Sequence, residues 1–248
     1  MLVLVTLGAP QRRLLDRRRK RREAAPEPDP TPVATARATV IDVGAPLEAL
    51  DQARAWLTGA GEDYLAGGLA VLNRALHAFR LVTANPFVNA IAREQALVAR
   101  VGYGAGEQVA DGLWADALEL ELAAPRQRRI RALHPQARLA AVLGGRERAL
   151  AAQELTLRAR LDLDAGRERE AALQLLVALD AALAELAVDA TAPALAERLA
   201  ELGDFRDALA RAAQTALAGP LGPADLETVS ATLGRVEAAL RARLAELS

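Results

Sequence analysis

Arginine is the residue in this sequence with the clearest capacity for specific chemistry. Of the 31 basic residues, 30 are arginine, and two clusters stand out along the chain. The guanidinium group is always charged and can hold a carboxylate or a phosphate through two parallel hydrogen bonds. Ten residues are therefore candidate contacts for a polyanion or an acidic partner: Arg17, Arg18, Arg19, Lys20, Arg21, Arg22, Arg126, Arg128, Arg129 and Arg131.

The first cluster gives the two parts of the chain opposite charge. Residues 11–23 contain eight basic and two acidic side chains, a net charge of +6, whereas the remaining residues have a net charge of −7. Such a segment can bind nucleic acid or an anionic membrane surface without reading a sequence. Base-specific recognition also needs aromatic side chains, and the chain has only two tryptophans, two tyrosines and three phenylalanines. A nonspecific polyanion binder that uses residues 11–23 is thus one alternative for the function.

Residue patterns typical of catalysis or metal binding are absent from the sequence. There is no cysteine, and neither His77 nor His134 has a second ligand at helical spacing. Serine occurs only at Ser230 and Ser248, which disfavours a Ser-His-Asp triad. We expect no enzymatic activity, no cofactor, no metal and no small-molecule substrate. An enzyme whose site has no recognisable pattern is the alternative.

Two short glycine motifs match binding loops only in part. Gly102 and Gly104 have the spacing that begins a dinucleotide loop, but Glu107 occupies the position of its third glycine and would repel a pyrophosphate. We therefore expect a turn between two helices at 102–106. The run Asp162-x-Asp164-x-Gly166 has glycine where a calcium loop needs its third oxygen ligand, so it favours a turn that ends a helix.

The elements that would position these groups are helices, and the segment 145–189 shows this best. Its second half has an apolar stripe at steps of three and four: Ala172, Leu175, Leu176, Leu179, Leu183 and Leu186. Its first half has Leu150, Leu157 and Leu161 on one side, widened by Leu155 and Ala159. Gly166 can adopt the left-handed conformation that ends a helix. We predict an antiparallel helical hairpin with its turn at Gly166.

Part of this hairpin resembles the tetratricopeptide family. The matching residues lie at about positions 155–183: Ala159, Leu161, Gly166, Arg167, Glu170, Ala171, Ala172, Ala178 and Leu179. No regular repeat near that family's period of about 34 residues accompanies them. The resemblance implies a helical surface that binds other proteins, and it implies no catalytic activity.

The start of the chain differs from the rest. The apolar run from Met1 to Ala9 precedes the arginines, an order typical of the cytoplasmic end of a membrane helix. A membrane-tethered protein is therefore another alternative for the function. The other interpretation of this run is a frayed, solvated terminus. Four alternating prolines between positions 26 and 32 favour an extended linker. We expect residues 1–33 to be disordered. We expect the β-branched run from Ala38 to Val43 to be extended chain without a strand partner.

Beyond residue 35 the sequence predicts an all-α protein. The expected architecture is a set of stacked antiparallel helical hairpins, an irregular α-solenoid or bundle, with a disordered N-terminal tail. Residues 1–35 form the apolar and basic tail with its proline-rich linker, and 36–248 form a helical domain that can be subdivided into 36–142 and 143–248. The expected helices are 46–58, 62–84, 87–101, 106–121, 127–142, 146–163, 167–188, 192–218 and 224–247.

The last two of these helices have a seam like that of a coiled coil. One contributes Leu195, Leu202, Leu209 and Ala216, and the other contributes Leu226, Val229, Leu233, Val236, Leu240 and Leu247. Arg206 and Arg243 fall at or near seam positions, so imperfect pairing would let the seam take up a second subunit or a partner helix. We therefore predict an interaction or scaffold module that binds a protein partner or itself through helical faces. The expected location is the cytoplasm or the cytoplasmic face of a membrane.

Overall fold

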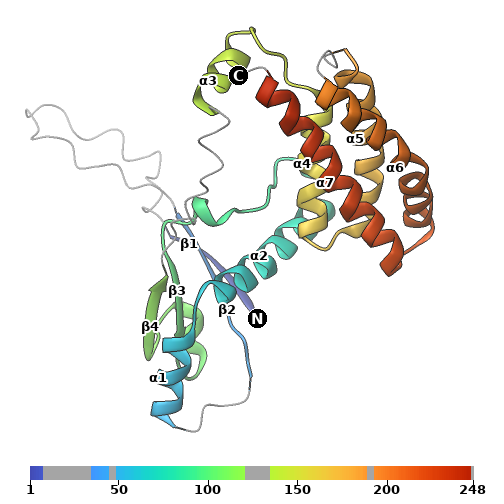
Figure 1. Cartoon of the computed structure of the whole chain (residues 1–248). Helices are drawn as coiled ribbons and strands as arrows, with labels where there is room; N and C mark the ends of the chain where they lie inside the picture. Colours follow the sequence, from blue (N-terminus) through green and yellow to red (C-terminus); the bar gives the residue numbers. More distant parts are fainter. Residues whose placement is uncertain (8–34, 45–48, 121–134, 189–192, 247–248) are drawn as a thin grey trace, which may run out of the picture. The chain divides into compact units, whose positions relative to one another are not determined.

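A computed structural model describes residues 1–7, 35–44, 49–120, 135–188 and 193–246 (Figure 1). Seven α-helices make up most of these residues, and the strands form two short antiparallel pairs, so the predicted predominance of helices is confirmed. The chain divides into two compact units, Met1–Pro125 and Arg126–Ser248.

The second unit contains four long helices that follow one another antiparallel (Figure 1). Its helices are α3 (Pro135–Leu143), α4 (Ala151–Asp164), α5 (Glu168–Leu186), α6 (Pro193–Ala218) and α7 (Pro223–Glu246). From α4 onward each helix contacts the next, and α7 also contacts α4 and α5. The helix α7 therefore closes the four into a bundle.

The predicted seam between the last two helices is confirmed and lies in the core of the bundle. Its buried members are Leu195, Leu202, Leu209 and Ala216 of α6 and Val229, Leu233, Val236 and Leu240 of α7. Arg206 lies outside the seam, on the surface, where it binds Asp180 of α5 at 2.7 Å. Arg243 of α7 is buried, the apolar members of the seam named above pack within the unit, and Leu247 lies outside the described residues.

The hairpin of α4 and α5 is confirmed, and Gly166 at its turn has a φ of +70°. The predicted stripe of α5 is buried or half-buried along its length. The predicted face of α4 is correct at Leu150, Leu155 and Ala159, which lie in or against the core, but it is wrong at Leu157 and Leu161, which are 67% and 50% exposed. The buried residues of α4 are Ala159, as predicted, together with Ala152 and Thr156.

Small side chains on α4 explain this difference. Two of its three buried residues are alanines, which let the helix lie close to the leucines of α5. The third, Thr156, donates its hydroxyl to the backbone oxygen of Ala152 at 2.6 Å, so burial leaves no polar group unsatisfied. The prediction therefore gave too much weight to large leucine side chains and too little to small residues that let α4 lie close to α5.

Side chains from neighbouring helices also satisfy helix ends in the bundle. The Glu185 carboxylate of α5 accepts hydrogen bonds from the backbone N–H groups of Ala151 and Ala152 at 3.1 and 3.0 Å. Arg169 of α5 donates to the backbone oxygen of Ala216 near the end of α6 at 2.7 Å. These contacts place a negative charge at a helix N-terminus and a positive charge at a helix C-terminus, where each is favoured by the helix dipole.

The first unit combines helices with strands. Its elements are β1 (Leu2–Leu7), β2 (Thr35–Val40), α1 (Leu50–Gly59), α2 (Glu62–Val82), the 3-10 turns η2 (Arg93–Gln95) and η3 (Glu107–Asp111), and the strands β3 (Ala99–Tyr103) and β4 (Asp116–Leu120). The strands pair as β1–β2 and β3–β4.

Pairing of β1 with β2 corrects two predictions. The strands run antiparallel with Leu2 opposite Val40 and Leu7 opposite Thr35, so the run that begins at Ala38 has a partner. The partner is the apolar run at the start of the chain, which is therefore ordered at residues 2–7 and not disordered or frayed. Its leucines and valines suit a half-buried strand surface. Residues 8–34, the rest of the expected disordered tail, lie outside the described residues.

The second strand pair replaces two predicted helices, 87–101 and 106–121. Ala99 lies opposite Leu120 and Tyr103 opposite Asp116, so the glycines at 102–106 belong to a hairpin and not to a turn between helices. Gly102 has a structural role there. A β-carbon at this position would lie 2.6 Å from the backbone oxygen of Asp116 and 3.0 Å from the ring of Trp114.

Candidate interaction surface

The helix α2 is held within the first unit along one side. It contacts β2 and β3. The Asn73 side chain accepts a hydrogen bond from the backbone N–H of Ile91 at 2.7 Å and donates one to the backbone oxygen of the same residue at 3.0 Å. Glu62 and Arg93 form an ion pair at 2.9 Å, and the Arg93 guanidinium lowers the pKa of Glu62 below its ordinary value. These contacts fasten the chain at 91–93 to α2.

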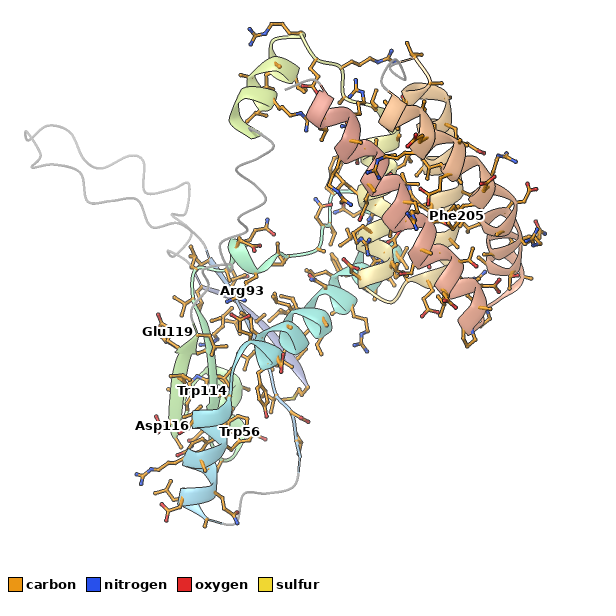
Figure 2. The ribbon with its side chains drawn as sticks, in the orientation of Figure 1. Trp56, Arg93, Trp114, Asp116, Glu119 and Phe205 are labelled. Atoms are coloured by element: carbon orange, nitrogen blue, oxygen red, sulfur yellow. The ribbon has the colours of Figure 1, made fainter. Side chains whose placement is uncertain are left out.

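An aromatic contact fixes the start of α2 against α1. The indole N–H of Trp56 donates to the hydroxyl of Tyr64 at 2.8 Å, and the two rings meet edge to face with their centroids 5.3 Å apart. Figure 2 shows Trp56 on α1, with Trp114 beside the β3–β4 hairpin. Because Tyr64 is the third residue of α2, this contact restricts how the helix can rotate about its own axis.

The opposite side of α2 faces solvent. None of the 21 residues of this helix is buried. A stripe at steps of three and four is exposed at every position: Asp63, Gly67, Ala70, Arg74, Ala78 and Leu81. Residues at these steps lie one above another on a helix, so the six share one face.

Large apolar side chains are also exposed at the end of α2 and in the chain that follows it. Leu81 is 66% exposed, Val82 86% and Phe87 85%. We call the stripe together with Val82 and Phe87 the α2 surface. Exposed apolar patches mark interaction sites in proteins that are otherwise well folded, so we take the α2 surface as the candidate site.

Sequence reasoning predicted α2 as a helix but missed its exposed face. The helix is apolar on several sides, and such a helix ordinarily lies in a core. The available signal was Asp63 with Arg74 on the stripe, because charged side chains on an apolar helix mark the side that is not buried. His77, expected beside a packing face, is half-buried in α2.

The ten candidate basic contacts, from Arg17 to Arg22 and from Arg126 to Arg131, lie outside the described residues, as does His134. Downstream of the second cluster, Arg138 forms an ion pair with Glu147 at 2.8 Å and holds the pKa of that carboxyl below its ordinary value. Arg146 and Arg148 are exposed. The described part of this region therefore includes one arginine that is already engaged within the chain.

Further arginines in the second unit join neighbouring helices. Arg160 of α4 binds Glu237 of α7 at 2.8 Å, and this carboxylate raises the pKa of Arg160. Arg206 bridges α6 to α5, as described above, and Arg235 of α7 binds Glu201 of α6 at 2.8 Å. At these positions arginine stabilises the bundle, which accounts for part of its abundance in the sequence.

The second glycine motif, like the first, has a structural explanation. The Asp162 carboxylate binds Arg167 at 2.7 Å across the turn that follows α4, and both side chains are largely buried. This ion pair and the left-handed Gly166 confirm a turn that ends a helix.

Neither the described side chains nor comparison with known proteins indicates a metal site, a membrane span or a related protein. Among the described residues, no group of three or more histidine, aspartate and glutamate side chains could hold a metal ion. None of the helices described here is both long enough and apolar enough to cross a membrane. Comparison with protein-family models, with curated proteins and with solved structures finds no match.

Proposed function

We propose that this protein is a non-enzymatic interaction module that binds a protein partner through the α2 surface. The observation that carries the proposal is a 21-residue helix with no buried residue. Elsewhere the first unit buries few apolar side chains, Ala53, Leu57, Ala60 and Val109, and the main core cluster of the described residues lies in the second unit.

The free energy available at this surface favours association. Complete burial of a leucine, valine or phenylalanine side chain contributes about 1.5–3 kcal/mol. Leu81, Val82 and Phe87 are each at least 66% exposed, so a partner that covered all three would recover most of that contribution from each. The stripe has one acidic and one basic residue, so its charges favour a protein partner over a polyanionic partner.

Site-specific photocrosslinking in the native cell tests this proposal. A benzophenone amino acid replaces Leu81 in the full-length chain, and separately Phe87. The matched control is Leu157 of α4, which is also a leucine exposed on a helix, at 67% against 66% for Leu81. We expect crosslinked products of discrete mass from positions 81 and 87 and none above background from position 157. Equal labelling at all three positions, or none at 81 and 87, would refute the proposal.

A further inference from the structure

The α2 surface has charges that complement one another. Asp63 and Arg74 are the only charged residues on its stripe, and both are exposed. Neither forms an ion pair with any other residue that the structure describes. They are separated by about three helical turns on the same face.

This spacing distinguishes the two ways in which α2 could pair with an identical helix. In a parallel pair, each Asp63 would face the other Asp63, and each Arg74 the other Arg74. In an antiparallel pair related by a twofold axis, every contact occurs twice with the roles exchanged. A register that places Asp63 opposite Arg74 then places Gly67 opposite Ala70, so both ion pairs form and the smallest residues meet near the axis.

We propose that the partner of the α2 surface is a second copy of this chain, bound through antiparallel pairing of the two α2 helices. This inference rests on the proposed function of that surface and names its occupant. The two ion pairs between Asp63 and Arg74 fix the direction and the register of the pairing.

The shape of the stripe fits this arrangement. A β-carbon added at Gly67 would meet nothing within 4 Å, so this point on the helix is open to a neighbouring backbone. Small residues where helices cross allow close approach and dispersion contacts along both helices. In this register the two α2 helices overlap over residues 62–75, and Leu81 and Val82 lie past the first residue of the other helix.

Charge exchange in the full-length protein tests the register. Analytical ultracentrifugation measures the dimer dissociation constant of the parent, of Asp63→Arg, of Arg74→Asp and of the double variant. Each single change turns two attractive pairs into two repulsive ones, so we expect it to raise the dissociation constant about tenfold or more. The double variant restores opposite charges across the interface, and we expect its dissociation constant within about threefold of the parent value.

Matched controls separate this effect from changes in net charge. Asp204→Arg and Arg198→Asp make the same charge changes at exposed positions of α6, and we expect them to leave the dissociation constant unchanged. Circular dichroism verifies that every variant keeps its helix content.

Two results would overturn the inference. One is a parent protein that stays monomeric up to about 100 µM, a range in which even a weak dimer would be detected. The other is a double variant that dimerises no better than the weaker single variant. A monomeric parent whose Leu81 position crosslinks to a different protein would refute self-association while supporting the proposed function, so the two proposals can fail separately.

Discussion

Replacement of Leu179 by alanine is the most direct test of how the bundle is held together. Leu179 is fully buried on α5, the helix that contacts α4, α6 and α7. The core around it is rich in alanine: Ala152, Ala159, Ala172, Ala178, Ala182, Ala212, Ala216 and Ala239. Alanine has no side-chain rotamers, so these residues cannot swing into a space that a shortened side chain leaves.

The magnitude follows from the lost carbons and from this rigidity. Three buried carbon atoms disappear, which at about 0.8 kcal/mol each removes about 2.4 kcal/mol of transfer free energy. The cavity adds a further cost that grows with the volume left unfilled, and measured Leu→Ala costs reach about 5 kcal/mol. We expect a loss of about 3–5 kcal/mol, in the upper part of that range, because the alanine-rich core collapses poorly.

Urea unfolding of the full-length protein measures this loss. Circular dichroism follows the helices, and tryptophan fluorescence follows the first unit, which contains Trp56 and Trp114. The control is Val177→Ala on the same helix, where the side chain is exposed and the expected cost is below about 0.5 kcal/mol. A circular-dichroism midpoint for Leu179→Ala no lower than that of the control would refute the reasoning about the core.

Three further predictions concern the second unit. Glu185→Ala removes the acceptor for two backbone N–H groups at the start of α4, and we expect urea unfolding to show a loss of about 0.5–2 kcal/mol. Arg138 lowers the pKa of Glu147, so the parent should be more stable than Glu147→Gln at pH values above the ordinary value of 4.5. This advantage should disappear as the pH falls through the lowered pKa. Urea unfolding from about pH 7 to about pH 3 measures it. Deletion of residues 223–248 uncovers the buried face of α6, and we expect light scattering to detect aggregation.

Each of these three predictions has a contrary outcome. Glu170→Ala changes an exposed glutamate of the same helix as Glu185, and an equal cost for both would show that the cap contributes nothing. A parent advantage over Glu147→Gln that grew on acidification would contradict the lowered pKa. A truncated protein that remained monomeric and equally stable would show that α7 does not complete the core.

The sequence was sufficient to predict the second unit because its helices repeat their apolar residues at regular steps. Leu202 and Leu209 recur at seven residues, and both are buried where that spacing placed them. Gly166 ended its helix because the left-handed conformation is accessible to glycine. Such signals are local, and they need no knowledge of distant residues.

The errors arose where the decisive contact lies far along the chain. The strand Leu2–Leu7 needs a partner that begins 28 residues after it ends, so its pairing was not visible in either segment alone. In the β3–β4 hairpin the Trp114 ring lies beside Gly102, and the alanine-rich flanks favoured helices there. On α4, Leu155 and Ala159 face the core as predicted, but Ala152 and Thr156 are buried there while Leu157 and Leu161 are exposed.

The candidate site shows the same limit more strongly. Composition directed attention to arginine, and several arginines of the described bundle pair with carboxylates on neighbouring helices, as Arg160 does with Glu237. The α2 surface depends on a negative property, the lack of a covering element among the residues that the structure describes. A single sequence does not reveal which face of an apolar helix remains uncovered.

Because α7 closes the bundle, its contact with α4 differs during folding from the contacts between consecutive helices. Contacts between consecutive helices join nearby residues, so each hairpin can form at a small cost in chain entropy. The ion pair between Arg160 and Glu237 joins residues 77 positions apart, and the contact between α4 and α7 therefore closes a long loop within the unit. A chain that emerges from the ribosome in order has α4 to α6 available before α7 exists. The early hairpins can then form, but their shared apolar face is covered only after residues 223–248, which contain α7, have been synthesised.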